Sequence, residues 1–146
     1  MSSEETAPVR VALVDDQALI RSGLAMLVDS QPDLTVVAEA GSGREAVASV
    51  SVAGADVVLM DVRMPEMDGI EATTRIREFS DVKIVILTTF DRDDYLFDAL
   101  DAGASGFMLK NAEADLLVTG LRQVAEGHAL LAPEATRRVI ARSASR

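Results

Sequence analysis

Residues 55–76 read ADVVLMDVRMPEMDGIEATTRI, and this segment is the most informative about the fold class. Its segment 56–60 is a short, nearly continuous apolar run, which is typical of a strand buried on both faces of a sheet. In 69–79 the apolar residues recur at helical spacing, which predicts a helix. The stretch is therefore one strand-loop-helix unit, with Asp61 placed where the strand gives way to the loop.

The same alternation of a short apolar run and a longer helical segment continues along the rest of the chain. Further strands are predicted at 9–14, 34–38, 83–87 and 106–109, and further helices at 17–30, 42–51, 91–103, 112–127 and 133–143. Right-handed crossovers between successive strands build a parallel sheet with helices on both faces. The fold class is therefore α/β, with five parallel strands.

Composition excludes several classes of protein. The chain has 146 residues, no cysteine and a formal net charge of −10. A chain of this length forms one domain, and the lack of cysteine excludes disulfides and thiolate metal sites. The negative charge disfavours direct binding to nucleic acid or anionic lipid. There is no signal peptide pattern and no apolar run long enough to cross a membrane, so we expect a cytoplasmic protein with no membrane contact.

Polar side chains gather where the predicted strands end. Asp15 and Asp16 follow the first strand, Asp61 the third, Thr88 the fourth and Lys110 the fifth. An aspartate after a strand is commonly only a helix cap. Caps do not explain three carboxylates and an ammonium on one edge of a sheet, and ligands of open α/β sheets bind at that edge. We therefore expect a functional site there.

Phosphoryl transfer to a carboxylate is the chemistry that uses this set of side chains. Crowded carboxylates raise one another's pKa, and a hard dication such as Mg²⁺ (or Mn²⁺) relieves the conflict. Asp61 would attack phosphorus. Lys110 would neutralise one phosphate oxygen, and Thr88 would donate a hydrogen bond to another.

The motifs resemble those of the receiver domains of bacterial two-component response regulators. They are DD at 15–16, DVRMPEMDG at 61–69, LTT at 87–89 and GFMLK at 106–110. The resemblance covers residues 9–127 and implies a CheY-like sheet of strand order 2-1-3-4-5.

The resemblance also implies a role for each residue of the site. Asp61 would be the phosphoacceptor for a sensor histidine kinase, and Asp15 or Asp16 would bind Mg²⁺ with it, Asp16 more closely. The backbone carbonyl of Arg63 would complete the metal site, and Thr88 and Phe107 would form the switch pair. Such a protein is a switch that catalyses only its own phosphorylation and dephosphorylation, not an enzyme.

The tail EGHALLAPEATRRVI, at 126–140, is similar to the segment that closes NarL/FixJ-type receivers before a LuxR-type helix-turn-helix. We expect 1–8 to be disordered and 128–146 to be a linker with a short helix. That linker would lead to a DNA-binding domain absent from this sequence, so the sequence is interpreted as a fragment of a transcription regulator. We expect a homodimer on phosphorylation through the first and fifth helices, because both carry more apolar residues than one buried stripe requires. These are Leu19 and Met26 in the first helix, and Leu116, Leu117, Val118, Leu121 and Val124 in the fifth. The alternative is that the extra residues cover the sheet or pack on the predicted helix at 133–143.

Three other interpretations account for parts of the sequence. Residues 41–46 have the form GxGxxA of a dinucleotide fingerprint, but they follow the second strand, and Ser42 with Glu45 forms a capping box. A haloacid-dehalogenase-type phosphatase needs a second aspartate two residues after Asp61, where this chain has Arg63. A receiver-like binding module without phosphorylation remains an alternative, although every expected functional residue is present.

Overall fold

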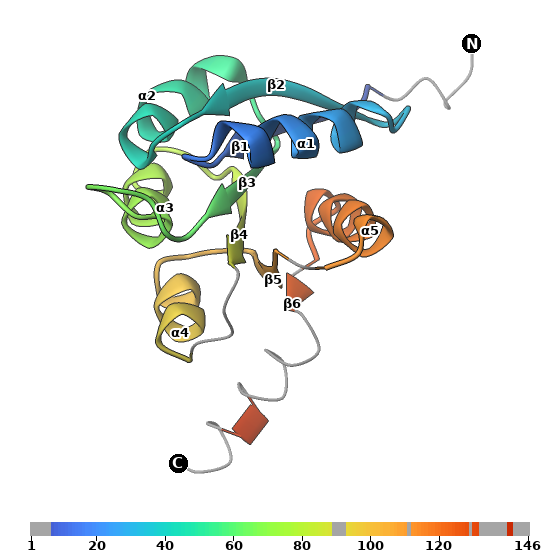
Figure 1. Cartoon of the computed structure of the whole chain (residues 1–146). Helices are drawn as coiled ribbons and strands as arrows, with labels where there is room; N and C mark the ends of the chain where they lie inside the picture. Colours follow the sequence, from blue (N-terminus) through green and yellow to red (C-terminus); the bar gives the residue numbers. More distant parts are fainter. Residues whose placement is uncertain (1–6, 89–92, 111, 129, 132–139, 142–146) are drawn as a thin grey trace.

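The computed structural model describes residues 7–88, 93–110, 112–128, 130–131 and 140–141. It contains one parallel sheet of order β2-β1-β3-β4-β5-β6 (Figure 1). The strands are β1 Val9–Val14, β2 Leu34–Ala40, β3 Val57–Asp61, β4 Lys83–Thr88, β5 Gly106–Leu109 and β6 Leu130–Leu131. The helices are α1 Ala18–Asp29, α2 Gly43–Ala53, α3 Gly69–Arg77, α4 Asp93–Asp101 and α5 Ala114–Ala125.

The predicted fold class and the strand order 2-1-3-4-5 are confirmed. β6 was not predicted: it lies in the segment expected to be a linker and pairs with β5 through Gly106–Leu130 and Phe107–Leu131. Most of the predicted helix at 133–143 and residues 1–6 of the predicted disordered terminus lie outside the described residues, although 140–141 are helical.

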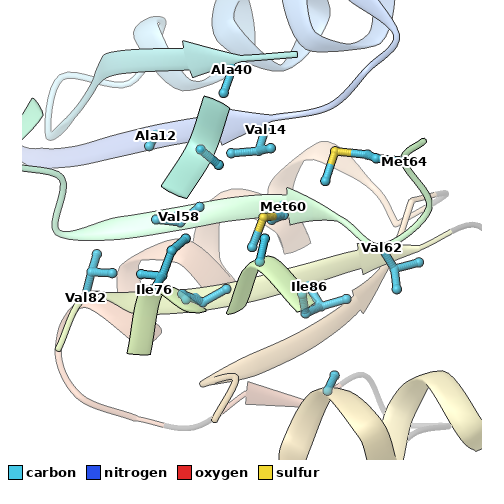
Figure 2. Close-up of a cluster of buried hydrophobic side chains, with 14 of the residues drawn as sticks. Ala12, Val14, Ala40, Val58, Met60, Val62, Met64, Ile76, Val82 and Ile86 are labelled. Atoms are coloured by element: carbon cyan, nitrogen blue, oxygen red, sulfur yellow. The ribbon is translucent and has the colours of Figure 1, made fainter. Parts of the chain in front are cut away.

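Two hydrophobic layers sandwich the sheet. One cluster joins the sheet to α2, α3 and α4, and includes Leu96 as well as Met60, Ile76 and Ile86. The last three are labelled in Figure 2. The other joins the opposite face to α1 and α5, which lie together on that side in Figure 1. All five residues of β3 are buried, as expected of a central strand covered on both faces.

Helix α5 packs closely on the sheet. Leu117, Val118, Leu121 and Val124 are buried, whereas Leu116 is 47% exposed. These four residues are therefore part of the core and not an exposed surface for a dimer, as the alternative interpretation of this helix expected. On α1, by contrast, Leu19 and Met26 are 86% and 75% exposed.

An ion pair joins α5 to the turn between α1 and β2. Arg122 binds both carboxylate oxygens of Asp33, at 2.7 and 2.9 Å, and also donates to the side chain of Gln31. These contacts join α5 to the loop that follows α1. Within the described part of the chain, no helix is long and apolar enough to span a bilayer.

The predicted cap of α2 forms. The backbone N–H of Glu45 donates to Ser42 Oγ, and the Glu45 carboxylate accepts from the N–H of Gly41. The glycine at 43 has a packing reason, because a Cβ there would lie 2.5 Å from the carbonyl oxygen of Met67. The glycine pattern at 41–46 is thus explained by capping and packing, without a nucleotide.

The loop between β3 and α3 folds back tightly on its own strand. Its last residue, Asp68, caps α3 by accepting from the N–H of Glu71 at 2.8 Å. The N–H of Gly69 donates to the Val62 carbonyl at 2.9 Å. A Cβ on Gly69 would lie 2.2 Å from the carbonyl oxygen of Asp61, a separation that real Cβ contacts do not show. Glycine at 69 therefore lets α3 begin directly against the end of β3.

We predict that Gly69→Ala lowers the free energy of unfolding by about 1–3 kcal/mol, because the methyl group displaces backbone atoms at Asp61 and Val62. Gly23→Ala is the matched control, since nothing lies within 4 Å of its Cβ position in α1. That change should stabilise the protein by about 1 kcal/mol, the difference in helix propensity. Urea denaturation measures both variants; equal stabilities would contradict the close contact at Gly69.

Candidate functional site

The residues predicted for the site lie at the carboxyl ends of four strands. Asp15 directly follows β1, Asp61 ends β3, Thr88 ends β4 and Lys110 directly follows β5. Backbone hydrogen bonds continue the sheet ladder at these positions: Asp15 donates to Ala40, and Lys110 donates to the carbonyl of Thr88. The positions of these side chains are therefore set by the sheet itself.

Lys110 lies between two carboxylates. Its Nζ is 3.0 Å from Asp15 Oδ2 and 3.1 Å from Asp61 Oδ2. Asp15 and Asp61 are buried, at 1% and 6% exposure, and the Lys110 side chain is 12% exposed. The ammonium thus bridges the ends of β1, β3 and β5 in a place that water reaches poorly.

Burial and charge act against each other on these groups. Burial raises the pKa of Asp61 above its usual value, and the nearby Lys110 offsets only part of that rise. For Lys110, burial alone would lower the pKa, but the contacts with Asp15 and Asp61 outweigh it and raise the pKa. The ammonium therefore stays charged at neutral pH, while the ionised form of Asp61 is disfavoured without further positive charge.

A divalent metal fits the carboxylates beside this lysine. One oxygen from each of Asp15, Asp16 and Asp61 lies within 4.8 Å of the others. Asp15 Oδ2 is buried and, within the described residues, accepts no hydrogen bond. That oxygen also forms an ion pair with Lys110, whose Nζ lies 3.0 Å away. Three carboxylates against one ammonium leave excess negative charge, and the donors are the hard oxygens that Mg²⁺ prefers.

The other predicted residues lie near the same edge in different environments. Asp16 is exposed although its neighbour Asp15 is buried. Arg63 is also exposed, and its backbone N–H lies 3.4 Å from Asp61 Oδ1 as a weak donor. Thr88 and Phe107 are both buried, at 0% and 1% exposure. The structure therefore brings together the acids, Lys110 and the end of β4, with Phe107 in the core below.

Arg21, which no motif in the sequence indicates, contacts the turn that contains Asp15 and Asp16, called the acidic turn below. Its Nη1 donates to the backbone carbonyl of Asp15 at 2.6 Å, and its Nε donates to Glu39 at 3.2 Å. The one signal in the sequence is a basic residue in the first turn of a helix, where the helix dipole favours an acid. A contact to a main-chain carbonyl leaves no motif.

Comparison with known proteins agrees with this geometry. Residues 11–122 match the family model "Response regulator receiver domain". Two curated relatives from Bacillus subtilis (strain 168) are the uncharacterized transcriptional regulatory protein YxjL and the transcriptional regulatory protein LiaR. YxjL is 44% identical over 84% of this chain and 56% of its own length. LiaR is 40% identical over 92% of this chain and 64% of its own. This chain thus spans less than two thirds of either relative.

A solved structure extends the comparison. The two-component response regulator of the LuxR family from Aurantimonas sp. SI85-9A1 superposes with a TM-score of 0.89 at 30% identity. The match covers 94% of this chain and 99% of that one. With the family model matching most of the sequence, the chain belongs to the response regulator receiver domain family.

Proposed function

We propose that the chain accepts a phosphoryl group on Asp61 from a sensor histidine kinase, and that this event controls a transcription-regulating output. The observation that carries the proposal is the Asp61 carboxylate at the end of the central strand β3. Lys110 Nζ lies 3.1 Å from it, and two further acids lie beside it. The family membership supports the same assignment.

In the proposed reaction an Asp61 oxygen forms a bond to phosphorus while the bond from phosphorus to the donor breaks. With a phosphohistidine donor, the leaving imidazole nitrogen keeps the electron pair; with acetyl phosphate, acetate leaves. Lys110 would neutralise the transferred phosphoryl oxygens, and the Thr88 hydroxyl would donate a hydrogen bond to one of them.

A bound Mg²⁺ would add positive charge that lowers the raised pKa of Asp61 and would offset charge on the phosphoryl oxygens. Asp15, Asp16 and Asp61, with the backbone carbonyl of Arg63, are the proposed ligands. The buried Asp15 oxygen that accepts no hydrogen bond within the described residues supports Asp15 as one of them.

The proposed output begins at Thr88 and Phe107. A phosphoryl group on Asp61 would draw the Thr88 hydroxyl inward, and Phe107 would repack in the space that is freed, which makes a two-state element. We propose that the second state forms a homodimer through α1 and α5. Its apolar contacts would be Leu19, Met26 and Leu116, which are exposed in the isolated chain. Contact with DNA is assigned to a separate output domain, since the net charge of −10 disfavours it here.

We expect Asp61→Asn to abolish labelling by acetyl phosphate in the presence of Mg²⁺, because the amide lacks the nucleophilic oxygen. Intact mass measures the gain of one phosphoryl group. Asp81→Asn, an exposed aspartate in the loop before β4, is the matched control and should be labelled like the wild type. Equal labelling of the two variants would place the phosphoacceptor elsewhere.

The raised pKa of Asp61 gives a pH prediction for the metal-free protein. The folded state binds the proton more tightly than the unfolded state, so ionised Asp61 costs stability at neutral pH. Asp61→Asn should therefore raise the melting temperature at neutral pH. As pH falls through the raised pKa toward the ordinary value of about 3.9, the wild type protonates and the difference should vanish. Thermal unfolding with a chelator present measures this; a variant less stable at neutral pH would contradict it.

The dimer prediction uses the exposed residues of α1. With beryllofluoride and Mg²⁺, the wild type should sediment as a dimer, whereas Leu19→Gln with Met26→Gln should remain a monomer yet still be labelled by acetyl phosphate. Phe79→Gln removes a side chain of comparable exposure, 50%, just after α3, and should leave the dimer intact. A wild type that remains a monomer when activated, or a double variant that dimerises normally, would argue against this surface.

A further inference from the structure

Arg21 links three segments at the edge of the site. It lies in the first turn of α1, donates from Nη1 to the Asp15 carbonyl at 2.6 Å, and donates from Nε to Glu39 at the end of β2 at 3.2 Å. Its side chain is 21% exposed, whereas that of Glu39 is 43% exposed. The guanidinium therefore fastens the acidic turn to both α1 and β2.

The acidic turn is held at each of its ends. The N–H of Asp15 donates to Ala40 at 3.1 Å, which fixes the incoming strand. Asp15 Oδ1 accepts from the N–H of Gln17 at 2.9 Å, and this bond shapes the entry to α1. Arg21 holds the carbonyl between these two bonds. That carbonyl begins the peptide leading to Asp16, so its position sets the direction in which the Asp16 carboxylate leaves the chain.

Arg21 is unfavourable for the helix that carries it. A cation near a helix N-terminus opposes the helix dipole, and α1 has neither an acidic residue in its first turn nor a capping side chain at Gln17. The contacts that offset this cost are those with Asp15 and Glu39. A purely electrostatic role for Arg21 would place the guanidinium on a carboxylate of the acidic pair, but it binds the main chain instead.

We propose that Arg21 is a positioning residue for the metal site: through the Asp15 carbonyl it holds the carboxylates of Asp15 and Asp16 within reach of Asp61. This inference rests on the proposed function, since it concerns the Mg²⁺ that assists phosphorylation. Arg21 touches neither the metal nor the phosphoryl group in this role. Its loss should weaken Mg²⁺ binding and leave Asp61 and Lys110 able to react once the metal is saturating.

The test measures Mg²⁺ binding directly, by titrating magnesium chloride into the unphosphorylated chain in a calorimeter. Arg21→Ala should raise the dissociation constant about tenfold, the lower end of what loss of a ligand-orienting partner costs. The acetyl phosphate labelling rate should need correspondingly more Mg²⁺ but reach a value near the wild type at saturation. Arg75→Ala is the matched control, because Arg75 forms an exposed ion pair with Glu71 on α3.

Two further variants separate positioning from charge and from folding. Arg21→Lys keeps the charge but loses the two-pronged donor, so it should bind Mg²⁺ nearly as weakly as Arg21→Ala. Glu39→Gln removes the charge of the outer anchor and should have a smaller effect in the same direction. If Arg21→Ala does not fold, these two decide the question.

The outcomes are distinguishable. A wild type that neither binds Mg²⁺ nor is labelled overturns the proposed function, and this inference with it. A wild type that does both, with Arg21 variants that bind Mg²⁺ equally well, overturns the inference alone. That result holds even if the variants melt at a lower temperature, because it would show that Arg21 only joins α1 to β2. Loss of a nearby cation by itself would tighten Mg²⁺ binding, so full recovery of Mg²⁺ affinity in Arg21→Lys would show that the two-pronged contact is not required and would also overturn the inference.

Discussion

One ammonium group shared by two buried carboxylates is the interaction on which this edge of the molecule depends. Lys110 lies about equally far from Asp15 and Asp61, which come from the adjacent strands β1 and β3. Without it, the pKa of Asp61, which burial and the neighbouring Asp15 both raise, would rise further. The sheet and its two apolar layers bring the acids to this place. Lys110 offsets part of the repulsion between the two acids, and the net negative charge that remains favours a bound cation.

The sequence predicted most of the fold because the strands are short apolar runs between amphipathic helices. The order of the strands came from the resemblance to receivers, since hydrophobic patterns do not specify which strands are neighbours. β6 was missed because two leucines show no periodicity. The apolar residues of α5 looked like more than one buried stripe needs, yet four of them pack on the sheet. The spacing of apolar residues along a helix predicts which side of the helix is buried better than it predicts how many residues that side buries.

The candidate site was predictable for a different reason. Parallel strands end at the same edge, so polar residues just after them must meet, and the structure brings Asp15, Asp61 and Lys110 into contact as that logic requires. Sequence reasoning did not separate Asp15 from Asp16, although one is buried and the other exposed. The contact of Arg21 with the acidic turn could not be predicted from the sequence, because its partner is a backbone carbonyl, which every residue possesses.

The close packing of glycine against backbone around the loop 62–68 has a consequence for reactivity. Gly43 lies against the Met67 carbonyl and Gly69 against the Asp61 carbonyl, each too close for any side chain. The loop is thus fixed between two helix N-termini and the strand that ends in Asp61, with little freedom to rearrange. A reacting group on such a support loses little conformational entropy on reaching its transition state. In the proposed reaction the two glycines, which carry no functional group, would therefore contribute to the rate by keeping the carboxylate of Asp61 in place before a donor arrives.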